Sequence, residues 1–72
     1  AGAEIGINCI INTKAMIEHD AKIGDHTHIS TGAIVNGDCT IGKRCFVGSN
    51  STLKNNIEVP DETIIPFGVK HG

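Results

Sequence analysis

The sequence predicts an all-β fold, a solenoid of parallel strands that occupies the whole chain, residues 1–72, as a single domain. Three observations predict it. Every sixth residue from Ile5 to Ile65 is a branched aliphatic, and nearly all residues two positions before these aliphatics are Val-sized or smaller. Asn, Asp and Gly dominate the positions three residues after them. A period of six is a multiple of the strand period of two and does not fit a helix, so it indicates strands.

Each aliphatic marks one short strand. The aliphatics, taken as the first positions of six-residue repeats, are Ile5, Ile11, Ile17, Ile23, Ile29, Val35, Ile41, Val47, Leu53, Val59 and Ile65. The small residues, in the fifth positions, are Cys9, Ala15, Ala21, Thr27, Ala33, Cys39, Cys45, Ser51, Ile57, Thr63 and Val69. Residues two apart on a strand lie on the same side, so a large and a small side chain point inward together.

The third and fourth positions of each repeat turn the corner between strands. The fourth positions are Asn8, Lys14, Asp20, His26, Gly32, Asp38, Arg44, Asn50, Asn56, Glu62 and Gly68, and seven of these eleven are types that tolerate positive φ. Three corners close a triangular coil of eighteen residues. The eleven repeats then predict three and two-thirds coils, in which residues eighteen apart stack at about 4.8 Å.

Composition excludes several classes of protein. The net charge is −2 and the six Lys and Arg residues are scattered, so we expect no nucleic-acid partner. No apolar run approaches the length of a membrane span, so we expect no membrane partner. The three cysteines occupy inward positions and are expected to be buried, unpaired and reduced, which favours a cytoplasmic protein. Because the chain lacks an initiator Met and begins inside the pattern, we expect it to be a piece of a longer protein.

Several large apolar residues fall at outward positions. These are Ile10, Met16, Ile34, Phe46 and Ile64. Outward aliphatics on a sheet face indicate contact with another subunit, and three copies suit a triangular prism. We therefore expect self-association as a homotrimer.

The repeat in IGDHTH, IGKRCF and VGSNST resembles that of the hexapeptide-repeat acyltransferases. The resemblance implies a left-handed parallel β-helix, normally homotrimeric. The longer stretch INTKAMIEHDAKIGDHTHISTGAIVNGDCTIGKRCFVGSNS is similar to the sugar acetyltransferases that include the sialic-acid O-acetyltransferases and the UDP-amino-sugar N-acetyltransferases. It implies direct transfer of an acetyl group from acetyl-CoA to a sialic acid or a nucleotide-linked amino sugar.

The same resemblance implies roles for five residues. His19, in the segment IEHD, matches the general base, and Asp20 matches the acidic residue that orients the imidazole. His28 matches a residue that lies against acetyl-CoA. Ser49 and Phe67 match turns that line the coenzyme cleft, which relatives form between neighbouring subunits.

The residues themselves leave other interpretations open. His19 is the third residue of its repeat, so it is expected on a corner, where a histidine is by default solvated and without a role. Three histidines close in sequence, His19, His26 and His28, raise the possibility of a zinc site, but the repeat places them on different corners and strands, so we expect no metal. A non-catalytic trimerisation scaffold is an alternative, because the acceptor-binding domain of relatives is absent from the sequence. Another hexapeptide enzyme, such as a serine O-acetyltransferase, is a second alternative.

Overall fold

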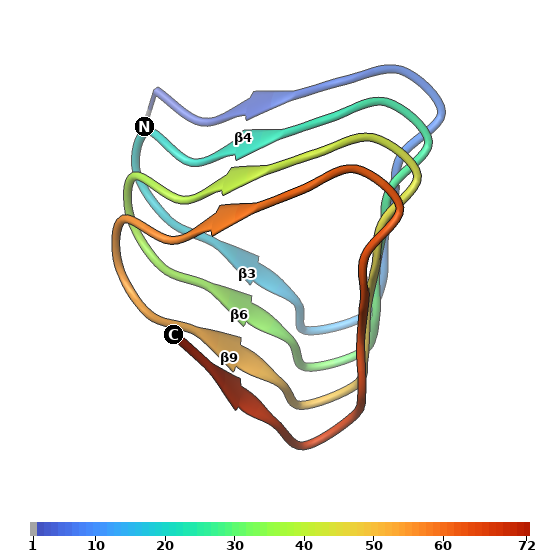
Figure 1. Ribbon diagram of the computed structural model, residues 1–72, viewed down its shortest axis with the longest axis vertical. Helices are drawn as coiled ribbons and strands as arrows, with labels where there is room; N and C mark the ends of the chain where they lie inside the picture. The colour runs from blue at the N-terminus through green and yellow to red at the C-terminus, as the bar shows by residue number, and fades with distance from the viewer. Residues whose placement is uncertain (1) are drawn as a thin grey trace.

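The computed structural model describes residues 2–72, which form twelve two-residue strands joined by turns (Figure 1). The strands are β1 (Glu4–Ile5), β2 (Ile10–Ile11), β3 (Met16–Ile17), β4 (Lys22–Ile23), β5 (His28–Ile29), β6 (Ile34–Val35), β7 (Thr40–Ile41), β8 (Phe46–Val47), β9 (Thr52–Leu53), β10 (Glu58–Val59), β11 (Ile64–Ile65) and β12 (Lys70–His71). Each ends on the inward position of a repeat, as predicted. No helix occurs within residues 2–72, and so none that could cross a membrane.

The strands form three parallel sheets of four strands each. Sheet A contains β1, β4, β7 and β10; sheet B contains β2, β5, β8 and β11; sheet C contains β3, β6, β9 and β12. Neighbouring strands are eighteen residues apart, so Ile5 pairs with Ile23 and Ile23 pairs with Ile41. The triangular coil is therefore confirmed.

The predicted count of three and two-thirds coils is one strand short. The additional strand, β12, places His71 opposite Leu53 in sheet C. His71 takes the position that aliphatics fill in every earlier repeat, and a count of aliphatics could not include it. With β12 each sheet has four strands, and the chain makes about four coils.

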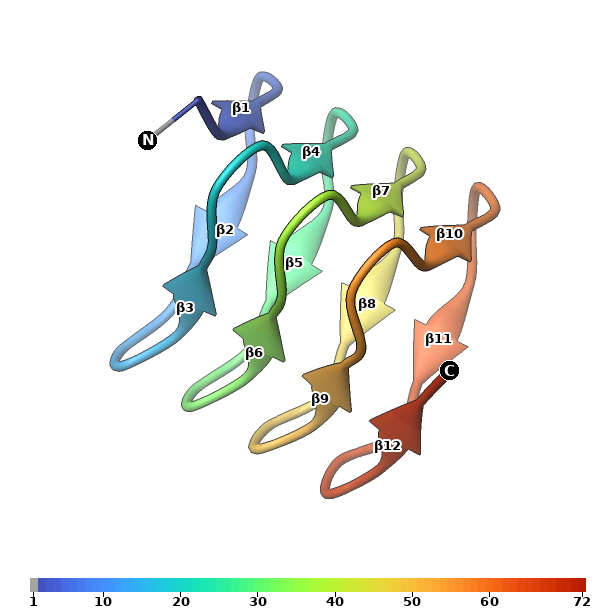
Figure 2. The same ribbon diagram turned by 90° about the vertical axis from the view of Figure 1, so that its left-hand side faces the viewer.

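The coil is left-handed. In Figure 2 the near strands β3, β6 and β9 run upward and the far strands β2, β5 and β8 run downward while the chain advances from left to right. Most parallel crossovers are right-handed, so this hand is an exception. The predicted left-handed parallel β-helix is confirmed.

The corners use the backbone conformation that the fourth positions predicted. All eleven of those residues have positive φ, from 54° at Asn8 and Arg44 to 71° at Gly32. Hydrogen bonds link each corner to the next coil, as where the Asp38 amide donates to the His19 carbonyl at 3.1 Å. These bonds satisfy backbone groups that the two-residue strands leave unpaired.

The core is a column of stacked aliphatic and small side chains. Ile29, Val35, Val47 and Leu53 are fully buried. All three cysteines are unpaired thiols; Cys39 and Cys45 are buried, as expected, whereas Cys9, in the first coil, is only partly buried. The thiols also donate to carbonyls of the following turn of the coil, as Cys39 Sγ does to Lys54 O at 2.9 Å. The cysteines are therefore both small core residues and hydrogen-bond donors.

The outer faces of the three sheets differ in character. The outward residues, in strand order within each sheet, are Glu4, Lys22, Thr40 and Glu58 on sheet A; Ile10, His28, Phe46 and Ile64 on sheet B; and Met16, Ile34, Thr52 and Lys70 on sheet C. We call the sheet B set the sheet B stripe. Sheet A is charged, whereas the sheet B stripe is apolar apart from His28.

Candidate functional site

His19 lies on the corner that joins β3 to β4. The repeat places it at a third position, and the positive φ of Asp20 (58°) completes the turn. The His19 carbonyl accepts the Asp38 amide of the next coil, which fixes the backbone of the corner, while the side chain stays 59% exposed. A histidine on a fixed backbone with an accessible ring is suited to proton transfer with a bound substrate.

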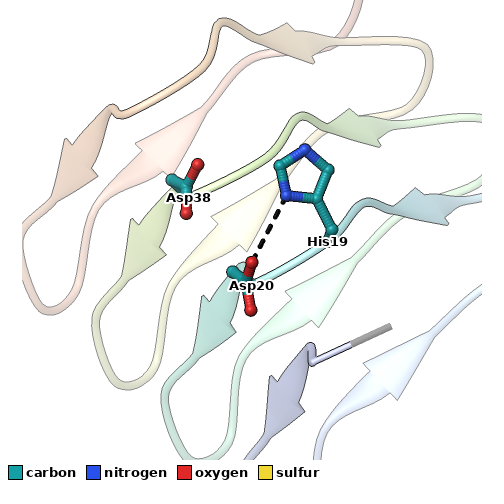
Figure 3. A group of neighbouring side chains, drawn as sticks. All are labelled: His19, Asp20 and Asp38. Carbon is teal, nitrogen blue, oxygen red and sulfur yellow. Dashed lines mark hydrogen bonds and ion pairs between the residues drawn. The ribbon is translucent and has the colours of Figure 1, made fainter.

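Asp20 lies beside the imidazole of His19. His19 Nδ1 is 3.4 Å from Asp20 Oδ2, and this is the only hydrogen-bond contact of the ring found within residues 2–72 (Figure 3). A proton on Nδ1 that faces the carboxylate leaves Nε2 as the basic nitrogen. The pair predicted from the sequence is therefore brought together, in the arrangement that orients a histidine base.

The ring of His19 extends over the next coil. A Cβ atom added to Gly37 would lie 2.6 Å from Nε2 and 2.7 Å from Cε1 of His19. The imidazole thus fills the space that a side chain at position 37 would occupy. The site is built from two successive coils.

Asp38 belongs to the same corner, although the sequence analysis did not predict it as a site residue. The potential ligand atoms of His19, Asp20 and Asp38 all lie within 4.8 Å of one another, and Figure 3 shows the three side chains close together on this corner. The signal for Asp38 was present, because it is eighteen residues after Asp20 and residues eighteen apart stack. Residues eighteen apart stack at the corners in the same way as in the core columns.

The predicted coenzyme-binding residues lie elsewhere on the protomer. Ser49 and Phe67 stack on the corner between sheets B and C, where the Gly68 amide donates to the Ser49 carbonyl at 2.8 Å. Phe67 is 78% exposed. His28 is half-buried in the sheet B stripe, its ring edge-on to Phe46 with centroids 5.1 Å apart, and its buried Nε2 has no hydrogen-bond partner within the described chain.

One protomer does not bring all five predicted residues together. His19 and Asp20 share the corner between sheets C and A, whereas Ser49 and Phe67 share the corner between sheets B and C. Sheet C separates these two corners, and His28 lies on sheet B, which does not border the His19 corner. A single site that includes all five residues would need a second protomer.

The His19 corner also offers ligand types that divalent metals accept. An imidazole and two carboxylates lie close together at His19, Asp20 and Asp38, and all three side chains are exposed. Exposed carboxylates are common without a bound ion, so their proximity alone does not indicate a metal site. The three histidines of the zinc alternative, His19, His26 and His28, lie on two different corners and one sheet face.

Comparisons with known proteins also identify the six-residue repeat. The model of the bacterial transferase hexapeptide family (six repeats) matches residues 2–37. The chain is also 30% identical over 76 aligned residues to a 2,3,4,5-tetrahydropyridine-2,6-dicarboxylate N-succinyltransferase from Xylella fastidiosa. The alignment covers 94% of this chain and 27% of that protein, so the chain spans about a quarter of that relative's length.

Proposed function

The chain belongs to the bacterial hexapeptide transferase family, and we propose that it carries the catalytic corner of an acyltransferase that moves an acetyl group from acetyl-CoA to a sugar. The observation that carries the proposal is the His19–Asp20 pair, with its 3.4 Å contact through Nδ1 and the accessible ring. The IEHD segment, which resembles that of the sugar acetyltransferases, supports a sialic acid or a nucleotide-linked amino sugar as the acceptor.

In the proposed reaction His19 removes a proton from the acceptor. The hydroxyl or amine attacks the thioester carbonyl, a carbon–oxygen or carbon–nitrogen bond forms, and its proton passes to His19 Nε2. The carbon–sulfur bond then breaks, and the leaving thiolate takes the proton as coenzyme A thiol. Asp20 holds Nδ1 and stabilises the imidazolium formed between these steps. No Ser or Cys lies on this corner, which favours direct transfer over an acyl-enzyme.

We further propose that the coenzyme binds between subunits of a homotrimer. The separation of the His19 corner from His28, Ser49 and Phe67 supports this, because a neighbouring protomer could supply the second set. The exposed Phe67 ring offers an apolar surface for the coenzyme beside Ser49. The three unpaired thiols fit a reducing, cytoplasmic setting.

The test is the release of coenzyme A thiol from acetyl-CoA in the presence of sialic acid or a UDP-linked amino sugar. His19→Ala is expected to lower kcat by about 100- to 10,000-fold, the usual contribution of a general base. His26→Ala is the matched control, since His26 is also a corner histidine but lies between sheets A and B. Turnover in His19→Ala equal to that of His26→Ala would refute the assignment of the base.

A second donor is supported by the N-succinyltransferase relative. Succinyl-CoA therefore belongs in the same assay, and faster transfer from it would replace acetyl as the proposed acyl group. Absence of transfer from both donors to both acceptors would favour the alternative of a non-catalytic scaffold.

A further inference from the structure

We infer that Gly37 is a positioning residue. Because Gly37 has no side chain, the His19 imidazole packs directly over it, and we call this space above Gly37 the seat of the imidazole. The inference rests on the proposed function for its catalytic consequence, but its structural part can be tested without any assay of activity.

The repeat does not require glycine at position 37. The third positions of the other repeats all carry side chains: Ile7, Thr13, His19, Asp25, Thr31, Lys43, Ser49, Asn55, Asp61 and Phe67. The φ of Gly37 is not in the positive range either, whereas positive values occur at Gly2, Gly32, Gly68 and Gly72. The backbone of this corner would therefore accept an L-residue.

The atoms closest to a side chain at Gly37 all belong to the His19 ring. The three atoms nearest to an added Cβ are Nε2, Cε1 and Cδ2 of His19, at 2.6, 2.7 and 3.2 Å. At Gly48, by contrast, the nearest atoms belong to the backbone of residues 65–67. A side chain at Gly48 would thus meet the backbone of the next coil first, whereas one at Gly37 would first meet a ring that can rotate away.

The seat fixes the ring relative to the two carboxylates. With the imidazole on Gly37, Nδ1 faces Asp20, and the ring lies close to both Asp20 and Asp38 (Figure 3). A methyl group at position 37 would force the ring from this place while the fold persists. Gly37 therefore acts on the proposed reaction through the orientation of His19.

Gly37→Ala tests the inference, with Asn55→Ala as the control one coil further along the same corner. Ring nitrogen NMR of His19 in the wild-type protein should report one dominant tautomer, protonated on Nδ1. Gly37→Ala should abolish that preference, and Asn55→Ala should retain it. Where turnover is measurable, Gly37→Ala should lower kcat by about 100-fold with little change in KM for the acyl-CoA, the scale expected for a displaced catalytic group.

A double variant separates the seat from a role in the fold. In a His19→Ala background Gly37→Ala should cause no further loss of turnover, and the unfolding midpoint should not fall. If Gly37→Ala alone fails to fold, the double variant should fold again, because the clashing ring is gone. An unfolded double variant, or an unchanged His19 tautomer in Gly37→Ala, would overturn the inference. A wild-type protein without turnover but with the predicted NMR change would support the seat and refute only the proposed function.

Discussion

At the scale of single residues, the corners place side chains where glycine would be the least strained choice. Within residues 2–72, nine residues other than glycine have positive φ, and four of these, Lys14, His26, Arg44 and Glu62, are neither Asn nor Asp. The left-handed conformation costs about 1–2 kcal/mol for such residues. The repeat imposes the conformation at every corner regardless of the residue type that occupies it.

Lys14→Gly is expected to stabilise the protein by about 0.5–1 kcal/mol. The relief of strain at φ 60° outweighs the extra chain entropy that glycine loses on folding. Lys22→Gly, on strand β4, should destabilise by a similar amount, since no strain is relieved there. Urea unfolding of both variants measures the two signs, and a Lys14→Gly variant less stable than wild type would contradict the account.

The sequence predicted where the residues lie more completely than which other residues they contact. The six-residue repeat predicted His19 and Asp20 on one corner and His28 alone on an outer face, and the structure has them there. It did not predict that His19 extends across to the next coil, because a rotamer depends on the space left by a residue eighteen positions away. Gly37 was missed for the same reason, whereas Asp38 follows from the eighteen-residue stacking of the corners.

At the scale of the elements, inward polar atoms connect successive turns of the coil. Thr27 Oγ1 donates to Gly42 O at 2.8 Å, and Cys39 Sγ donates to Lys54 O at 2.9 Å. In both cases a fifth-position side chain reaches a carbonyl fifteen residues ahead. The sequence predicted small buried residues there, but the hydrogen bond depends on the closeness of the coils and could not be inferred from size.

Cys39→Thr and Cys39→Val form a matched pair for this bond. The two side chains have nearly the same shape, but only threonine can donate to the Lys54 carbonyl. Cys39→Val should be less stable than Cys39→Thr by about 1 kcal/mol, the usual net value of one hydrogen bond. Thermal unfolding of the two variants measures the difference. Equal midpoints would mean that the thiol serves only as a small core residue.

At the scale of the whole molecule, the apolar residues of the sheet B stripe remain open to solvent in the protomer. Ile64 is 73% and Ile10 is 53% exposed, while sheet A presents Lys and Glu at the equivalent positions. The repeat predicted outward apolar residues, and the structure places three of them on sheet B in one row with His28. A neighbouring subunit on this face would cover these apolar residues. In the proposed shared site, one protomer would then supply His28 and the other the His19 corner.

Subunit mixing tests whether the proposed site is shared. If His19 of one protomer works with His28 of its neighbour, His19→Ala and His28→Ala proteins should each be nearly inactive. Unfolded and refolded together, they should regain part of the wild-type turnover, because some interfaces then hold both histidines. Two batches of His19→Ala refolded together are the control and should stay inactive.

A second experiment tests whether the subunits meet through the outer face of sheet B. Ile64→Asp should shift the protein toward monomers in sedimentation, since a charge would have to be desolvated in an apolar contact. Thr40→Asp, on the outward face of sheet A, should not. Regained activity in the mixed sample together with loss of assembly in Ile64→Asp would place the site between subunits that meet through sheet B. No regained activity from a mixture that does assemble would mean that His19 and His28 do not act together across a subunit contact. Full turnover in the His28→Ala protein alone would mean that His28 has no part in the site.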